Sequence, residues 1–329
     1  MFVSLFTCPI CQSPLSPATD NWHCDGSLST RQQTSQQTDQ QTRQTLHSFD
    51  VARQGYVNLL PVQQKKSKQP GDSLESIIAR QRFLQAGYYQ PLQALICQQI
   101  DSLLANKPVE INAEQEKASI NWLDIGCGEG YYTQAIAQIE SIDQLIAADI
   151  SKPAVLAVTK ASKLAKRLWL QNDHRSQAQS DNKKTAIYPI VTSAANLPLS
   201  TNSITGISSI FSPILPAAFA EVLQNKGYLV IAKPDIGHLA SVREALFDEV
   251  REHNSDKFLT ELAPFFELIE TQYVNTELSL PVTALADLLT MTPYAYRAQP
   301  EKRQALIAMA ETEDFQTQAK FVIYVLQKK

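Results

Sequence analysis

The chain has 329 residues, of which 19% are charged and 44% are apolar, and its formal net charge is −4. This length allows about two or three domains with a large buried core, and the composition is that of an ordinary globular protein. No apolar run approaches the roughly 18 residues of a membrane span, and the apolar residues 1–7 lack a basic region, so we expect a cytoplasmic protein without a signal peptide or membrane span.

The first chemical motif is a group of three cysteines, Cys8, Cys11 and Cys24, out of five in the chain. The first two form a C-x-x-C pair, whose thiolates can bind one metal ion, and Cys24 is the predicted third ligand. His47 is the predicted fourth ligand and His23 the competitor, because His23 is adjacent to Cys24 and adjacent residues rarely turn toward one ion. A redox pair and free thiols are the alternatives, although a redox pair lacks its expected βαβ surroundings.

A polar segment interrupts this first part of the chain. Residues 25–46 are almost all Gln, Thr, Ser and Arg, and they hold too little apolar surface to offset the entropy lost on ordering. We therefore predict a disordered insertion within a zinc-binding module of residues 1–62. Because closing a long flexible loop costs little entropy, the insertion still lets His47 complete the site. Residues 63–119 are predicted to be a helical linker region, since apolar residues recur there at helical spacing.

The stretch from Arg53 to Arg82 is basic, although the chain as a whole is acidic. It holds six Lys or Arg residues against Asp72 and Glu75. Charge interactions in solution are local, over roughly 8 Å, so such a stretch can bind phosphates whatever the net charge. A solvated polar loop is the alternative. The six cations are Arg53, Lys65, Lys66, Lys68, Arg80 and Arg82.

A strand, a glycine-rich turn and a helix are predicted around residues 120–139. Gly126, Gly128 and Gly130 follow Asp124 in the order D-x-G-x-G-x-G. Glycines let the backbone approach a ligand, and the next helix offers unpaired N–H groups at its start. A pyrophosphate site would show G-x-G-x-x-G, whereas an acid before the first glycine favours a cationic amino-acid ligand such as S-adenosylmethionine, with its ammonium and sulfonium. The alternative is a tight turn that binds nothing.

Strands and helices alternate beyond this loop and predict a parallel sheet. We expect strands at 145–148, 187–191, 204–210, 228–232 and 315–326, helices at 152–168 and 216–223, and a turn at 225–227. Parallel sheets bind ligands at the carboxyl ends of their strands, so one crevice should gather the residues there. Asp149 lies about 20 residues past the loop, where a carboxylate commonly holds ribose hydroxyls. The predicted crevice residues are Asp124, Asp149, Ser193, Phe211 and His238.

The remaining cysteines and aromatic residues have two interpretations each. Cys97 is on an apolar helical face and is expected in the core, and Cys127 is expected to pack or to line the pocket without acting as a nucleophile. Tyr131, Phe211 and Tyr294 could stack on a nucleobase, but aromatic side chains more often pack in the core.

Several motifs together resemble one family, the bacterial 23S rRNA (guanine-N1)-methyltransferases with an N-terminal zinc finger. The resemblance covers nearly the whole chain, and its most specific parts are G-Y-V-N-L-L at 55–60 and P-G-D-S at 70–73. The other parts are the cysteines with H-x-F-D at 47–50, A-R-x-x-F-L-x-x-G-x-Y-x-P-L at 79–92, the glycine loop at 124–132, and M-T-P-Y-A-Y-R at 291–297.

The resemblance implies an α/β chain: a Rossmann-like class I methyltransferase domain at residues 120–329 and a small N-terminal zinc-binding domain. It implies methyl transfer from S-adenosylmethionine to ring N1 of a guanine in a hairpin loop of 23S rRNA, one structural zinc and a homodimer. The implied zinc ligands are Cys8, Cys11, Cys24 and His47. The implied cofactor contacts are Tyr89, Gly128, Glu129 and His238, with Asp149 at the ribose.

The chain departs from the family pattern in three places. The stretch between Cys24 and His47 is long, Ser209 stands where the family suggests an arginine, and the turn at 225–227 lacks Pro-Gly-Gly. The second departure bears on contacts with the RNA or the target base. A small-molecule methyltransferase of the quinone type is the competing hypothesis, although a small substrate needs neither a zinc module nor a basic stretch. A non-catalytic RNA-binding adaptor is a third possibility, which the intact glycine loop opposes.

Overall fold

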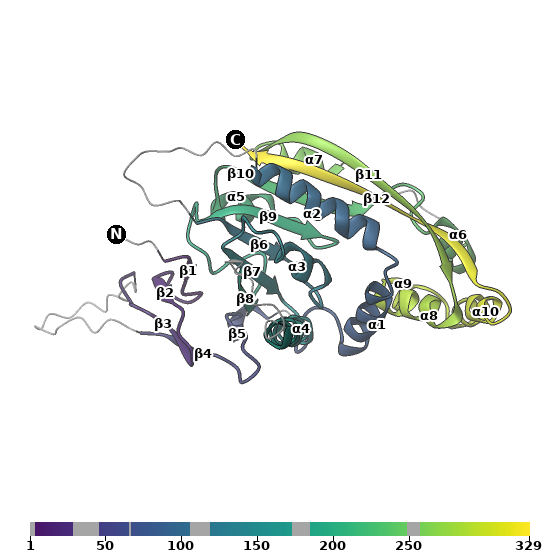
Figure 1. Cartoon of the computed structure of the whole chain (residues 1–329), viewed down its shortest axis with the longest axis horizontal. Helices are drawn as coiled ribbons and strands as arrows, with labels where there is room; N and C mark the ends of the chain where they lie inside the picture. The colour runs from purple at the N-terminus through teal and green to yellow at the C-terminus, as the bar shows by residue number, and fades with distance from the viewer. Residues whose placement is uncertain (1–3, 29–45, 66, 106–118, 173–184, 249–256) are drawn as a thin grey trace, which may run out of the picture.

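A computed structural model describes residues 4–28, 46–65, 67–105, 119–172, 185–248 and 257–329 (Figure 1). Most of the predicted insertion lies outside these ranges, at 29–45, and so do 106–118 of the predicted linker and 173–184 of a polar stretch. Within the described ranges, no helix is long and apolar enough to cross a membrane.

The larger sheet of the described residues has eight strands. They are β5 (Val57–Asn58), β6 (Asn121–Ile125), β7 (Gln144–Asp149), β8 (Ala186–Val191), β9 (Ile204–Ile210), β10 (Leu223–Pro234), β11 (Phe266–Leu280) and β12 (Phe315–Lys328). Their order is β11-β12-β10-β9-β6-β7-β8-β5. The strands from β10 to β5 are parallel, and β12 is antiparallel to both of its neighbours. The order β8-β7-β6-β9-β10 is that of a doubly wound sheet, with its switch point between β6 and β9. The predicted Rossmann-like fold class is therefore confirmed.

Helices cover both faces of this sheet, because alternate strand residues point to opposite sides. Trp122 of β6 packs in the apolar cluster on one face, and Leu123 packs in the cluster on the other. The first face is covered by α1 (Leu74–Gln85), α2 (Gln90–Ala105), α3 (Tyr131–Ile136), α4 (Lys152–Asn172), α6 (Ala240–Leu246), α8 (Val282–Met291) and α10 (Pro300–Ala310). The second is covered by α5 (Pro216–Val222) and α7 (Lys257–Leu262). A short helix, α9 (Tyr294–Arg297), follows α8.

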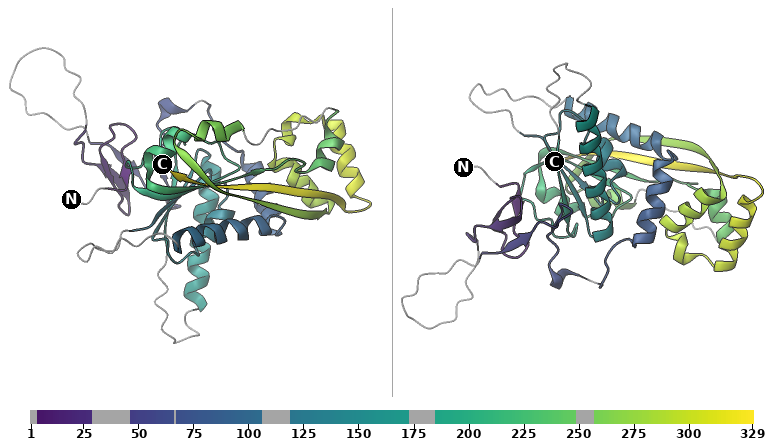
Figure 2. Two further views of the ribbon diagram at one scale, coloured as in Figure 1. Left: turned by 90° about the horizontal axis from the view of Figure 1, so that it is seen from above. Right: turned by 60° about the horizontal axis from the view of Figure 1, so that its bottom comes forward.

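The N-terminal module is a small antiparallel sheet of β1 (Phe6–Thr7), β2 (Pro14–Ser16), β3 (Asn21–Cys24) and β4 (Ser48–Asp50). Phe6 and Trp22 pack against Tyr188 of the large sheet, with ring centroids 5.4 and 6.2 Å from the tyrosine ring. Figures 1 and 2 show this module at one end of the molecule and α8, α9 and α10 at the other. The switch point of the large sheet, between β6 and β9, lies between them.

Three parts of the chain differ from the predicted elements. The turn expected at 225–227 lies inside β10, where Lys226 has a φ of 59° and the register with β9 shifts. The longest ladder, between β11 and β12, has a first strand that was not predicted. Helices α1 and α2 pack in the core of the large sheet, so residues 74–105 are part of that core. The domain boundaries at 62 and 119 stay predictions.

Candidate functional site

The four predicted metal ligands come together in the N-terminal module. The ligand atoms of Cys8, Cys11, Cys24 and His47 all lie within 4.8 Å of one another. His47 Nδ1 is 3.6 Å from the Sγ atoms of Cys8 and Cys24, and the Sγ atoms of Cys11 and Cys24 are 3.7 Å apart. A zinc–sulfur bond of about 2.3 Å gives a tetrahedron with sulfur–sulfur edges of about 3.8 Å, so these spacings suit one zinc ion.

Strand pairing explains why His47 reaches the cysteines across the insertion. β3 and β4 are antiparallel, with His23 opposite Ser48. One residue further, Cys24 donates its backbone N–H to the carbonyl oxygen of His47, and the His47 N–H points to Cys24 Sγ at 3.1 Å. The side chains of neighbouring strand residues point to opposite faces, so the exposed His23 is turned away from the cluster.

The glycine loop joins β6 to α3 in a backbone conformation that favours glycine. Gly126, Gly128 and Gly130 have φ values of 72°, 55° and 93°. A Cβ on Gly126 would lie 2.3 Å from the Cβ of Ser212, so no other residue fits there without movement. The Gly126 N–H donates to the carbonyl oxygen of Ala148 at 2.8 Å, which fixes the loop on the end of β7.

The carboxylate of Asp124 is buried beneath this loop. It accepts hydrogen bonds from the hydroxyls of Thr133, at the start of α3, and Ser208 of β9. Burial raises the pKa of Asp124 to about 6. The side chain therefore ties β6 to α3 and β9, and the prediction that it contacts a cofactor directly stays a prediction.

Asp149 at the end of β7 is turned toward the same loop. It accepts the N–H of Gly128 at 3.0 Å and the N–H of Ser151 at 2.7 Å. Burial raises the pKa of Asp149 and these two hydrogen bonds lower it. The carboxylate lies where a ribose partner is predicted, and protein N–H groups also hold it there.

Glu129 is buried in the glycine loop, just before α3, and lines a cavity of about 340 Å³. Burial raises the pKa of Glu129, and the positive charge of Arg80 lowers it. Glutamines from α1, α2 and α3 line the same cavity, namely Gln81, Gln85, Gln93 and Gln134. Glu129, a predicted cofactor contact, thus faces a cavity that it shares with residues of α1 and α2.

Aromatic rings form a wall near the carboxyl ends of β9 and β10. Tyr89 is buried, and its ring centroid is 6.4 Å from those of Phe211 and His238 and 4.7 Å from that of Phe321. Burial lowers the pKa of His238 to about 4, so its imidazole is neutral at pH 7. The Nδ1 atom of His238 lies 2.9 Å from the carbonyl oxygen of Lys320. The structure therefore brings Tyr89 and His238 together, although they are far apart in the sequence.

Phe211 is the residue of this wall that is open to solvent. It follows β9, is 44% exposed, and has a φ of 55°, which is an outlier for a bulky side chain. Such strain clusters at ligand sites. Sequence patterns place Phe211 at a strand end but do not reveal this backbone conformation. Tyr294, another predicted stacking residue, has its ring centroid 5.8 Å from that of Phe247.

Two serines near the crevice have different positions. Ser193 lies just beyond β8, and its Oγ accepts the N–H of Ala195 at 3.2 Å, so it is at the predicted strand end. Ser209 is buried within β9 and hydrogen-bonds with Ser212, whose hydroxyl donates to the carbonyl oxygen of Ile125. Ser209 therefore supports the glycine loop, which accounts for its position without an RNA contact.

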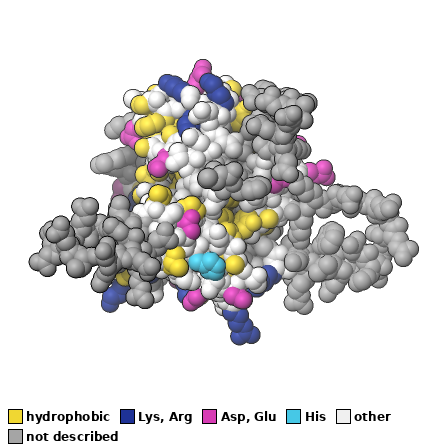
Figure 3. All heavy atoms as spheres, turned by 90° about the vertical axis from the view of Figure 1, so that its left-hand side faces the viewer, with side chains coloured by type: hydrophobic (Ala, Val, Ile, Leu, Met, Phe, Trp, Pro, Cys, Tyr) yellow, Lys and Arg dark blue, Asp and Glu magenta, His cyan; other side chains and the backbone are white. Residues whose placement is uncertain are grey.

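Two cations of the basic stretch form ion pairs with carboxylates of the same chain. Arg80 pairs with Asp72 at the crevice, and Arg82 pairs with Asp287 of α8. Arg53, Lys65 and Lys68 are exposed, and Lys66 lies outside the described residues. Figure 3 shows that basic and acidic side chains are interspersed on the described surface of one face, so they form no single basic patch in that view.

The two cysteines outside the metal cluster have apolar surroundings. Cys127 is buried, and burial raises the pKa of its thiol well above the ordinary value. Cys97 packs against the core, and burial raises its pKa to about 11. Both are therefore protonated at neutral pH, as expected for residues that do not act as nucleophiles.

Comparisons with known proteins point to the same family as the motifs. A family model described as RlmA, N-terminal, a zinc ribbon, matches residues 30–68, which include His47. The chain is 27% identical over 308 residues to a 23S rRNA (guanine(748)-N(1))-methyltransferase from Streptomyces fradiae, covering 93% of this chain and 91% of the relative. It is 26% identical over 320 residues to YxjB from Bacillus subtilis, which is provisionally named a 23S rRNA (guanine-N(1)-)-methyltransferase. This match covers 94% of this chain and 93% of the relative. The predicted resemblance is thus confirmed: the chain combines an RlmA-type zinc ribbon with a class I methyltransferase fold and is homologous over most of its length to 23S rRNA (guanine-N1)-methyltransferases.

Proposed function

We propose that this chain transfers a methyl group from S-adenosylmethionine to ring N1 of a guanine in a hairpin loop of 23S rRNA. One observation carries the proposal: this chain has a glycine loop at the switch point of its sheet and is similar, over 93% of its length, to a Streptomyces fradiae enzyme that is named for this reaction. We further propose a cytoplasmic location, where bacterial rRNA is made and modified.

The crevice suits the charges of this cofactor. The carboxylates of Asp124, Glu129 and Asp149 lie around the glycine loop, and S-adenosylmethionine carries a cationic ammonium and a cationic sulfonium. The loop backbone is open to close approach because its glycines carry no Cβ. When bound, the cofactor would supply the methyl group: the N1–C bond would form as the S–C bond breaks, S-adenosylhomocysteine would leave, and the N1 proton would pass to solvent. The protein's part is to bind both reactants in line.

Phe211 is our candidate for the contact with the target base. A base-modifying enzyme must extract its base from the stack, and aromatic rings can receive the extracted base. Phe211 lies at the carboxyl end of β9, next to the strand that carries the glycine loop; it is exposed, and its ring centroid is 6.4 Å from those of Tyr89 and Tyr132. The strained φ would be retained because it directs this ring toward the crevice.

The competing hypotheses have less support. A quinone-type substrate needs no zinc ribbon, and the relatives over most of the chain are named for rRNA methylation. A non-catalytic adaptor has no use for a glycine loop in which a Cβ at Gly126 would meet Ser212.

We also propose that two copies of the chain associate, as the resemblance implies. β11 is the edge strand of the large sheet and pairs, among the described strands, with β12 alone. Leu268, Ile269 and Tyr273 on β11 are 43%, 50% and 63% exposed. Exposed apolar groups on an edge strand favour a protein contact. Light scattering of the wild type and of Ile269→Lys tests this: a dimer that the substitution dissociates supports it, and a wild-type monomer refutes it.

A substrate-choice assay tests the proposed activity. The protein is incubated with labelled S-adenosylmethionine and either 23S rRNA that lacks the modification or a quinone precursor. We expect label in the rRNA alone. Label in the quinone precursor and none in rRNA would favour the competing hypothesis, and Phe211→Ala should lower the rate on rRNA while cofactor affinity stays unchanged.

A further inference from the structure

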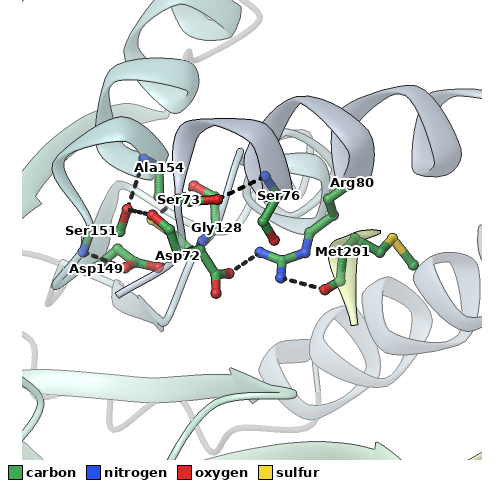
Figure 4. Close-up of polar contacts among 10 residues, drawn as sticks. Asp72, Ser73, Ser76, Arg80, Gly128, Asp149, Ser151, Ala154 and Met291 are labelled. Atoms are coloured by element: carbon green, nitrogen blue, oxygen red, sulfur yellow. Dashed lines mark hydrogen bonds and ion pairs between the residues drawn. The ribbon is translucent and has the colours of Figure 1, made fainter. Parts of the chain in front are cut away.

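Arg80 places a guanidinium directly at the glycine loop (Figure 4). Its Nη1 atom lies 2.6 Å from Asp72 Oδ2, and its Nη2 atom donates to the carbonyl oxygen of Met291 at 3.3 Å. A Cβ built on Gly128 would lie 3.5 Å from Nη1. The side chain of Arg80 therefore reaches from α1 to the glycine loop.

The charge of Arg80 acts on the crevice carboxylates. Burial opposes the charge of Arg80, but Asp72, Glu129 and Asp149 together raise its pKa above the ordinary value. Burial raises the pKa values of Glu129 and Asp149, and the positive charge of Arg80 lowers both of them. The guanidinium is thus a permanent positive charge among three acids.

The proposed cofactor makes a specific demand on this region. Its methionyl end carries a carboxylate beside the ammonium. The acids around the loop attract the ammonium and the sulfonium, but they repel the carboxylate unless a cation lies next to them. We propose that Arg80 binds the carboxylate of the methionyl end of S-adenosylmethionine and so selects a ligand with an intact amino-acid group. This inference rests on the proposed function, because it names a ligand contact within the same site.

The arrangement leaves room for a second carboxylate on Arg80. A guanidinium has five N–H donors in a planar fork, of which two have recorded acceptors within the described residues. Asp72 is 47% exposed on its side chain, so it can share the guanidinium or turn to solvent at little cost. Met291 contributes a backbone carbonyl, which keeps the fork oriented when Asp72 moves.

The backbone around Asp72 is anchored independently of its side chain. The Ser151 hydroxyl donates to the carbonyl oxygen of Asp72 at 2.9 Å, and a Cβ on Gly71 would lie 2.7 Å from Ser151 Cβ. Ser73 then caps α1, accepting the N–H of Ser76 at 3.1 Å. The P-G-D-S segment therefore packs on the loop after β7 and starts the helix that carries Arg80.

A purely structural role for Arg80 would be to tie α1 to α8, and Arg82 provides a matched control. Arg82 lies about half a turn further along α1. It pairs with Asp287 of α8 through two guanidinium nitrogens. Its side chain is 62% exposed, and of the two arginines only Arg80, not Arg82, lies within 4 Å of a Cβ built on Gly128. Loss of Arg82 therefore removes an α1–α8 contact without removing the proposed ligand contact.

The test measures binding of two ligands by calorimetry: S-adenosylmethionine and decarboxylated S-adenosylmethionine, which keeps the sulfonium and the ammonium. We expect the wild type to prefer the intact ligand by about 10- to 100-fold, as for a charge-assisted hydrogen-bonded pair. Arg80→Gln should lose this preference, Arg80→Lys should retain part of it because the charge remains, and Arg82→Gln should keep it fully.

The outcomes separate this inference from the proposed function. Equal wild-type affinity for the two ligands would overturn the role of Arg80 and leave the proposed function intact. An undiminished preference in Arg80→Gln would overturn it as well. Failure of the wild type to bind S-adenosylmethionine at all would refute the proposed function itself. If Arg80→Gln does not fold, the wild type and Arg80→Lys still decide the question.

Discussion

Replacing Gly126 by alanine is expected to damage the crevice through a single added carbon. The new Cβ would lie 2.3 Å from the Cβ of Ser212, and the backbone φ of 72° disfavours any side chain. The left-handed conformation costs about 1–2 kcal/mol, and the overpacking costs about 1–3 kcal/mol more. We therefore expect a loss of about 2–5 kcal/mol in the free energy of unfolding.

Gly55→Ala is the matched control, because it carries the backbone cost without the clash. Gly55 has a φ of 99°, and the nearest atoms to a Cβ there are 3.5 Å or more away. Denaturant unfolding should show the smaller loss, about 1–2 kcal/mol, in this variant. Calorimetry should show unchanged affinity for S-adenosylmethionine in Gly55→Ala and at least about a tenfold loss in Gly126→Ala, equivalent to about 1.4 kcal/mol.

A double substitution tests the cause. Gly126→Ala combined with Ser212→Gly removes the atom that the new Cβ meets, so it should recover the overpacking part of the loss, after correction for Ser212→Gly alone. The reasoning would be refuted if Gly126→Ala were as stable as Gly55→Ala and bound the cofactor with wild-type affinity.

Three further predictions concern the metal, the pH dependence and the RNA. Metal analysis should find about one zinc per chain in the wild type and in His23→Ala, but none in His47→Ala. Zinc retained in His47→Ala and lost in His23→Ala would show that His23 is the fourth ligand. Burial lowers the pKa of His238 from 6.5 to about 4, so the unfolded chain binds more protons in this window and stability should fall as the pH falls from 6.5 to 4, by up to about 3 kcal/mol. His238→Gln should lack this loss of stability. The raised pKa of Asp124 has the opposite effect on stability in both proteins, so the quantity to compare is the difference in stability between the wild type and His238→Gln at each pH. Identical pH profiles of stability in the two proteins would contradict the assignment. Neutralising the three lysines within residues 65–68 should reduce the log–log salt slope of RNA binding by up to about three and leave cofactor affinity unchanged, whereas an unchanged slope would place RNA binding elsewhere.

The sequence predicted the parts of the fold that follow from local patterns. Alternating strands and helices around the glycine loop gave the parallel sheet, and the C-x-x-C pair gave the metal cluster. His47 was preferred to His23 because His23 is adjacent to Cys24, and the flexible insertion let His47 reach the site. The structure adds a second reason, because β3–β4 pairing places His47 opposite Cys24. Strand β11 was missed because its exposed and buried residues follow no regular alternation, and only its pairing with β12 makes it a strand.

The candidate site was less predictable because its residues acquire their positions through tertiary contacts. Arg80 looked like one cation of a basic stretch, whereas the packing of α1 on the loop turns it toward Gly128. Asp124 was expected in the crevice, yet Thr133 and Ser208 hold both of its oxygens beneath the loop. Consequently Asp124→Ala would also leave buried hydroxyls without an acceptor, so it cannot separate cofactor binding from stability.

The most direct test of the proposed activity is the identity of the methylated nucleoside. The protein is incubated with S-adenosylmethionine and 23S rRNA that lacks the modification, the RNA is digested to nucleosides, and the products are identified by chromatography and mass spectrometry. We predict N1-methylguanosine at one residue per rRNA, within a hairpin loop, and none when Gly126→Ala replaces the wild type. A methyl group on another guanine atom or another base, or unmodified rRNA with an active cofactor site, would contradict the proposal.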